Sequence, residues 1–166
     1  MSYSLTQLNQ MSQDEFVTAV GQVFEHTPSV AEQAGVKRPF TNLDELYQVM
    51  VKVVKEMSPE EQLGLICAHP DLGTKAKMAD ASVKEQSEVG LDRLSPDEFD
   101  RFLRLNQVYR DRFGFPFIIA VKKQTKESIL DAFEVRTNHS IEAEKQQALD
   151  EICQIARFRL EDLVKE

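Results

Sequence analysis

The stretch "ICAHPDLGTK", residues 66–75, places a histidine where a side chain could take part in proton transfer. Pro70 disfavours the α conformation for His69, so the preceding helix is expected to end here, and Gly73 permits a further turn. A histidine held at such a junction suits general acid or base catalysis near neutral pH. The alternative is a histidine that only packs at a helix end, and the local sequence taken alone favours that structural role.

Two further features could belong to a polar site. Asn106 lies within an apolar helical stripe, where its amide needs hydrogen-bond partners, and we interpret it as a structural tie between helices in preference to a part of the site. The stretch "GFPFIIAVK", 114–122, is rich in β-branched and aromatic residues, yet it has no second strand with which to pair. Its backbone groups could bind a polar ligand beside a cleft, or the segment could be a buried connector between helices.

Capping motifs in the sequence predict where several of the helices that position these residues begin. Each of "SQDE", "SPEE" and "SPDE" places a serine as N-cap and a glutamate three residues later, which predicts helices that begin near residues 13, 59 and 96. Further boundaries are expected from caps at Thr41, Thr125 and Ser140, from the short turn "SVAEQAG" ended by Gly35, and from the stop at Gly114.

The resulting pattern is nearly all helix. The stretch 74–90 is polar and loop-like, and no repeat or linker divides the chain. We therefore expect an all-α fold, a single-domain bundle over residues 1–166 of about seven to nine helices, with one short extended segment near 114–122.

Composition argues against several classes of partner. The 166 residues carry 28 acidic and 20 basic side chains, a formal charge of −8, with no basic stripe, so a nucleic-acid partner is not expected. The chain shows neither the apolar core of a signal peptide nor the roughly 18 apolar residues of a membrane span. A cytoplasmic protein without a membrane partner is expected. Cys67 and Cys153 lie on apolar helical faces and are expected to be core thiols.

A metal centre is not expected from the histidines. His26, His69 and His139 form no H-x-x-x-H or E-x-x-H pair on one helix. His26 and His139 lie near helix ends, where a histidine needs no function.

Three stretches occur in a distinctive order: "FEHTPSVAEQAGVKRPF" (24–40), "HPDLG" followed by "SVKEQSEVGLDRL" (69–94), and "LNQVYRDRFGFPFIIAVK" (105–122). Together they resemble the family of 2-oxo-4-hydroxy-4-carboxy-5-ureidoimidazoline (OHCU) decarboxylases of urate catabolism, over nearly the whole chain. The resemblance implies an all-α homodimer that uses no metal or organic cofactor and converts a small-molecule substrate, OHCU, into (S)-allantoin. Members often carry a tryptophan where this chain has Ser29, so packing around the N-terminal helices is expected to differ.

The resemblance also implies roles for particular residues. His69 is the expected acid or base, and Glu85 either orients that imidazole or crowds the scissile carboxylate. Ser82 has a competing interpretation as the N-cap of a helix in a capping box with Glu85, and Gln86 as a solvated side chain. The residues that the resemblance assigns to substrate binding are Pro70, Ser82, Gln86, Phe117, Ile118, Ile119 and an arginine of "RFRL", for which we choose Arg159.

Two arginines in "RFRL" compete for the last of these roles. Arg157 and Arg159 fall to either side of the buried stripe of the final helix, so symmetry alone cannot choose between them. Ile152 and Ile155 extend the apolar surface on the Arg159 side, so Arg159 is expected to lie deeper. The family pattern also favours the arginine directly before leucine. The competing function for the whole chain is an acidic helical module that binds another protein through a groove.

Overall fold

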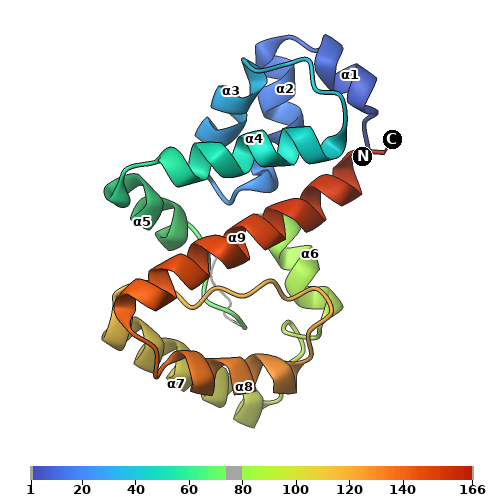
Figure 1. Ribbon diagram of the computed structural model, residues 1–166. Coiled ribbons are helices and arrows are strands. Elements are labelled where there is room, and N and C mark those ends of the chain that lie inside the picture. Colours follow the sequence, from blue (N-terminus) through green and yellow to red (C-terminus); the bar gives the residue numbers. More distant parts are fainter. Residues whose placement is uncertain (1, 74–79, 166) are drawn as a thin grey trace. The chain divides into compact units, whose positions relative to one another are not determined.

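The computed structural model describes residues 2–73 and 80–165, and Figure 1 shows the helices that they form. This part of the chain contains nine α-helices, one short 3-10 helix and no β-strand, which confirms the predicted all-α fold. None of the described helices combines the length and the apolar composition needed to cross a lipid bilayer. In chain order the elements are α1 (Leu5–Gln10), α2 (Gln13–Val20), η1 (Gly21–Val23), α3 (Ser29–Gly35), α4 (Leu43–Glu56), α5 (Pro59–Cys67), α6 (Asp80–Glu88), α7 (Pro96–Phe113), α8 (Lys126–Arg136) and α9 (Ile141–Leu163).

Reciprocal capping sets the starts of α2, α5, α7 and α8 where the sequence predicts them. The hydroxyl of Ser95 accepts the Glu98 amide at 3.2 Å, and the Glu98 carboxylate accepts the Ser95 amide at 2.8 Å. The same exchange begins α2 and α5. The predicted cap at Thr41 is wrong by one residue, because the Asn42 side chain reaches the amide of Glu45 and α4 starts at Leu43.

The interpretation of 74–90 as a loop is wrong for its second half. Residues 80–88 form α6, whereas 74–79 lie outside the described residues. The two most buried described side chains of α6 are polar, Ser82 and Gln86, and its other described positions are partly or fully exposed. A helix that buries a narrow polar face shows no apolar periodicity, so its sequence gives no helical pattern to detect.

The chain forms two compact units. Unit 1 comprises Met1–Leu65 and Cys153–Glu166, and unit 2 comprises Ile66–Ile152. The boundary falls inside α5 and α9, and α9 supplies its residues up to Ile152 to unit 2 and the rest to unit 1. The expectation of one domain over residues 1–166 stays a prediction.

Unit 1 packs α3 against both α2 and α4 (Figure 1). Its core includes Phe16, Val30 and Leu46, all fully buried. Two polar contacts add to this core. Arg38 donates to the carbonyls of Leu8 and Met11 at the end of α1, and the Tyr47 hydroxyl of α4 donates to a backbone carbonyl of α9 at 3.1 Å. The bonds from Arg38 satisfy carbonyls at the end of α1 that have no partner within the helix, and the bond from Tyr47 joins α4 to α9.

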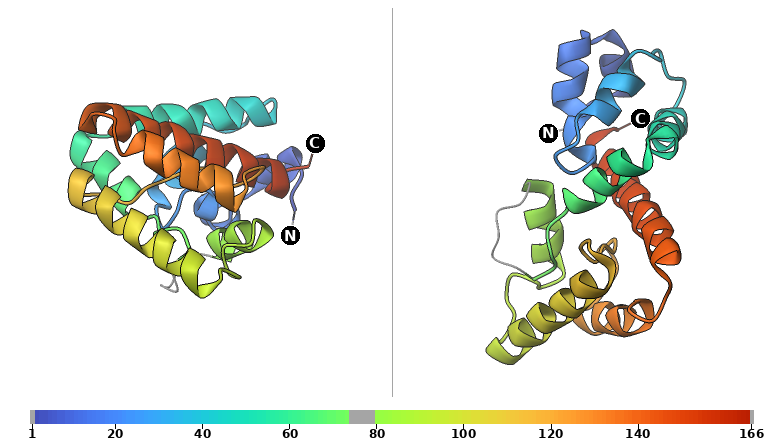
Figure 2. Two further views of the ribbon diagram at one scale, coloured as in Figure 1. Left: turned by 90° about the horizontal axis from the view of Figure 1, so that it is seen from below. Right: turned by 90° about the vertical axis from the view of Figure 1, so that its left-hand side faces the viewer.

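Unit 2 packs α7 against α8 (Figure 2), and an aromatic cluster fills its core. The Phe117 ring stacks on Phe133 with centroids 3.9 Å apart, and it meets the Tyr109 ring edge-on at 5.2 Å. Gly114 ends α7 in the left-handed conformation, as predicted. The segment 115–121 that follows is buried throughout and belongs to no strand, as the connector interpretation expects.

Candidate active site

The candidate histidine follows the end of α5. That helix ends at Cys67, and the His69 backbone amide donates to the Ile66 carbonyl at 3.2 Å. The His69 side chain is buried, with only 7% of the residue exposed. Cys67 is exposed, so its interpretation as a core thiol is wrong; the last residue of α5 turns toward solvent although its neighbour Ile66 is buried.

The loop after His69 is tied to two helices. The Gly73 amide donates to Oε1 of Gln86 on α6 at 3.0 Å, and Nδ2 of Asn106 on α7 donates to the Leu72 carbonyl at 2.9 Å. Both side chains are buried. The predicted role of Asn106 as a structural tie is thus confirmed, although the tie runs from helix to loop. Fixed hydrogen bonds of this kind restrict the backbone that carries the histidine.

Gly73 is required by the shape of this loop. Its φ is +70°, and a Cβ built there would lie 2.9 Å from a methyl carbon of Leu94. A second tie lies on the solvent side, where Arg110 of α7 donates to the Asp71 carboxylate at 2.8 Å. Exposed pairs of this kind contribute little stability, so the buried amide contacts dominate the tie.

The three candidate residues of α6, Ser82, Glu85 and Gln86, lie on one face of that helix, because their spacing is i, i+3 and i+4. Ser82 and Gln86 are buried, and Glu85 is half-buried. The alternative of Ser82 as N-cap is wrong, since α6 begins at Asp80 and Ser82 is its third residue. The alternative of a solvated Gln86 is wrong as well, because its Oε1 holds the Gly73 amide.

Two charged side chains form hydrogen bonds with the backbone at and next to Phe117, Ile118 and Ile119. Arg136 at the end of α8 donates through Nη1 to the Ile118 carbonyl at 2.6 Å. Glu151 of α9 accepts the Ala120 amide at 3.0 Å. Sequence reasoning missed both. The sequence did carry a signal for Arg136, because this residue shares a helical stripe with the buried Ile129 and Phe133. A charged side chain seldom occupies such a stripe without a partner, so its presence there indicates a buried polar contact.

Arg159 lies in unit 1, on the last turns of α9. Its Nη2 donates to the Glu25 carboxylate at 3.1 Å, and its Nη1 to the Val23 carbonyl at 3.3 Å. Only 6% of Arg159 is exposed, whereas Arg157 is half-buried and pairs with Asp44 at 3.0 Å and Glu161 at 3.6 Å. The predicted order of burial of the two arginines is confirmed, and the role of Arg159 in substrate binding stays a prediction.

The other candidate residues all belong to unit 2. These are His69, Pro70, Ser82, Glu85, Gln86, Phe117, Ile118 and Ile119. They offer an imidazole, a carboxylate, a hydroxyl, an amide and backbone groups, a set suited to proton transfer and to recognition of a polar ring. Among the residues that the structure describes, no three histidine, cysteine or acidic side chains gather as they would around a metal ion.

Comparison with known proteins gives a consistent result. The model of the OHCU decarboxylase family matches residues 9–161. The 2-oxo-4-hydroxy-4-carboxy-5-ureidoimidazoline decarboxylase of Haloferax volcanii is 47% identical over 157 residues, which cover 95% of this chain and 94% of the relative. The uric acid degradation bifunctional protein of Bacillus subtilis is 46% identical over 99% of this chain, which spans 33% of that longer protein. Among solved structures, an (S)-allantoin synthase superimposes with a TM-score of 0.76 at 30% identity, over 96% of this chain and 54% of that one.

Proposed function

This chain belongs to the OHCU decarboxylase family, and we propose that it is a carboxy-lyase that converts OHCU into (S)-allantoin in urate degradation. The observation that carries the proposal is the setting of His69, a buried histidine on a loop whose backbone is fixed by Gln86 and Asn106. Such a setting holds a titratable group in one place, which efficient proton transfer requires.

The chemistry accounts for a reaction without a cofactor. In OHCU the carbon that loses carbon dioxide also carries a hydroxyl and lies next to a C=N bond. When the C–C bond to the carboxylate breaks, carbon dioxide leaves, the electron pair forms a C=C bond to the ring carbon that bears the ureido group, and the nitrogen of the former C=N bond takes up a proton to give an enol. The hydroxyl then loses its proton, and the ring carbon that bears the ureido group gains one. Since the substrate accepts its own electrons, the protein has only to orient it and to move protons.

We assign the proton transfers to His69 and an orienting or carboxylate-crowding role to Glu85. Ser82 and Gln86 on the buried face of α6 suit the ureido and ring amide groups, since each offers both a donor and an acceptor. Pro70 and the backbone of Phe117, Ile118 and Ile119 would complete the surface around the ring, and Arg159 would donate to anionic or carbonyl oxygens.

The proposal extends to the state of the whole protein. We propose a cytoplasmic homodimer in which residues 1–166 act as one functional domain, with no metal or organic cofactor and no nucleic-acid or membrane partner. Sedimentation equilibrium at micromolar protein would test the dimer. Activity that falls in EDTA and returns with a divalent ion would contradict the metal-free chemistry.

The role of His69 is tested by its substitution. Purified protein should accelerate the loss of freshly generated OHCU over a protein-free control, and His69→Asn should lower kcat by roughly 10² to 10⁴ while the far-UV circular dichroism stays native. His26→Asn is the matched control, because His26 is exposed in unit 1 and has a positive φ that asparagine tolerates. A fully active His69→Asn enzyme would return this histidine to a structural role. A protein that gives only the control rate would instead favour the helical interaction module.

A further inference from the structure

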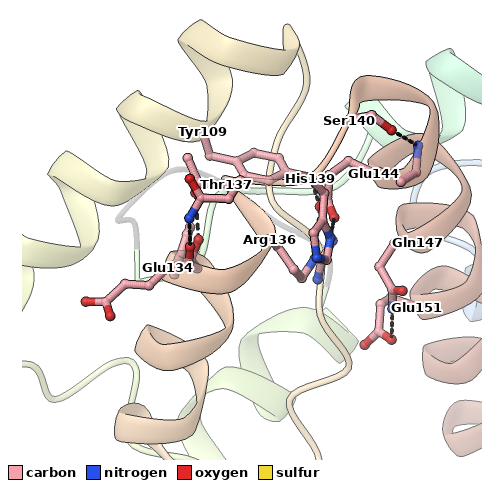
Figure 3. A network of polar contacts seen from close by, with 12 residues as sticks. Tyr109, Glu134, Arg136, Thr137, His139, Ser140, Glu144, Gln147 and Glu151 are labelled. Atoms are coloured by element: carbon pink, nitrogen blue, oxygen red, sulfur yellow. Dashed lines mark hydrogen bonds and ion pairs between the residues drawn. The ribbon is translucent and has the colours of Figure 1, made fainter.

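A buried polar cluster contacts the segment that we assign to the substrate ring. Figure 3 shows the Glu144 carboxylate of α9 between three donors, one from α7, one from the end of α8 and one from the loop that follows. The Tyr109 hydroxyl donates to Oε1 at 2.5 Å, Arg136 Nε donates to the same oxygen at 2.9 Å, and His139 Nδ1 lies 2.9 Å from Oε2. Glu144 is fully buried, and His139 is the member that is exposed to solvent.

The cluster holds the guanidinium of Arg136 in one orientation. With Nε fixed on Glu144, Nη1 points to the Ile118 carbonyl at 2.6 Å, and Cζ lies 4.3 Å from the centroid of the Phe117 ring. Nη2 is buried and has no hydrogen-bond partner among the described residues. Burial also raises the pKa of Tyr109 above its ordinary value, helped by the hydrogen bond to Glu144, so the phenol stays protonated as the donor.

A buried ion pair such as Arg136–Glu144 adds little net stability to the fold. Desolvating two charges offsets much of their attraction, and well-packed apolar side chains often stabilise a core as well or better. An unsatisfied buried donor adds a further cost. What a planar, fixed guanidinium supplies that an apolar residue cannot is a directed donor to one carbonyl together with a flat face for one ring.

A second charged side chain holds the other end of the same segment. Oε1 of Glu151 accepts the Ala120 amide at 3.0 Å, and Oε2 accepts from Gln147 one turn earlier on α9 at 2.9 Å. Arg136 of α8 and Glu151 of α9 therefore each form a hydrogen bond with one of the two backbone groups that flank Ile119. Since this segment belongs to no strand, no neighbouring ladder fixes its backbone.

We infer that Arg136 and Glu151 are positioning residues for substrate binding, because they set the backbone of Phe117–Ala120 against which the substrate ring would lie. This inference rests on the proposed function. Neither side chain needs to touch the substrate. Their effect is to keep the peptide groups of this segment aimed in the directions that ring recognition requires, and Glu144 acts through Arg136 in the same way.

The test compares KM with kcat for variants of both residues. Arg136→Lys keeps a charge for Glu144 but replaces the fork with a point donor, and Glu151→Ala removes the acceptor for the Ala120 amide. Each should raise KM for OHCU about tenfold, the size expected for one charge-assisted hydrogen bond, with a smaller change in kcat. Glu151→Gln keeps an oxygen for the amide and should restore a KM close to that of the unmodified protein.

A purely structural role predicts a different result. Loss of folded protein lowers kcat calculated on total enzyme and leaves KM unchanged, so that pattern in both variants would overturn the inference. Arg101→Lys is the matched control, since Arg101 of α7 forms an exposed pair with Glu134 of α8 at 3.3 Å and should leave KM unaltered. If Arg136→Lys fails to fold, the half-buried Glu151 pair of variants decides alone. An unmodified protein without activity would contradict the proposed function itself.

Discussion

At the scale of single residues, burial separates side chains that the sequence leaves equivalent. Arg157 and Arg159 are two positions apart on α9, yet Arg157 pairs with half-exposed to exposed acids and Arg159 with the fully buried Glu25. A buried carboxylate that loses its partner keeps its desolvation cost, whereas an exposed one regains water. The two arginines therefore differ in their importance for folding as well as in their proposed contact with substrate.

Substitution of the two arginines should separate these effects. Arg159→Ala should cost about 3–5 kcal/mol of unfolding free energy, because the fully buried Glu25 loses its guanidinium partner, and Arg157→Ala about 0.2–1 kcal/mol. Arg159→Lys keeps a charge for Glu25 and should fold, but it should lose at least about tenfold in kcat/KM because a point charge replaces a planar fork. Denaturant titration and steady-state kinetics give both quantities. Larger kinetic damage from Arg157→Lys would refute the assignment of Arg159.

At the scale of helices, capping contacts fix where the site-bearing elements begin. Ser95 caps α7, the helix whose Asn106 holds the loop of His69. Ser95→Ala should lower the free energy of unfolding by about 1 kcal/mol, since it removes the acceptor for the Glu98 amide. Thermal unfolding measures the change, with the exposed Ser2→Ala as control. Equal stability of the two variants would show that the capping box contributes nothing.

The same cap should make stability depend on pH. The hydrogen bond from the Ser95 amide, and then the Lys126 ammonium, lower the pKa of Glu98 below its ordinary value. A carboxyl with a depressed pKa in the folded state stabilises the protein above its unfolded pKa, and that contribution is lost as the pH falls through the folded value. The stability difference between the unmodified protein and Glu98→Gln should therefore shrink between neutral pH and about pH 3. A difference that stays constant over this range would contradict the effect.

Local rules predict part of this structure and fail for identifiable reasons. Capping boxes and Gly114 act within one turn of helix, so the starts of α2, α5 and α7 and the end of α7 are readable from the sequence. Helix α6 cannot be predicted from apolar periodicity, because its most buried described side chains are polar. The hydrogen bonds from Arg136 and Glu151 to the backbone of 117–120 join residues 18 and 31 positions apart in sequence, and no local pattern encodes such contacts. The motif resemblance supplied candidate residues, but not these supporting contacts.

At the scale of the whole molecule, α9 is one continuous helix that contributes to both units. If residues 1–166 act as one domain, core damage in either unit should shift one shared unfolding transition. Leu46→Ala in unit 1 and Ile129→Ala in unit 2 remove fully buried side chains and should each cost about 2–5 kcal/mol. Circular dichroism and tyrosine fluorescence should report coincident curves for both variants. A variant that moves one of two separate transitions would show that the units unfold independently.

The most direct measurement of the central claim is the optical activity of the product. OHCU generated freshly from its precursor decays without protein to racemic allantoin, because the proton reaches either face of the ring carbon. An enzyme that delivers this proton from one side gives a single enantiomer. We predict that catalytic amounts of this protein yield a circular dichroism signal of (S)-allantoin that grows faster than spontaneous decay consumes substrate. A racemic product formed at the rate of the protein-free control would contradict the account.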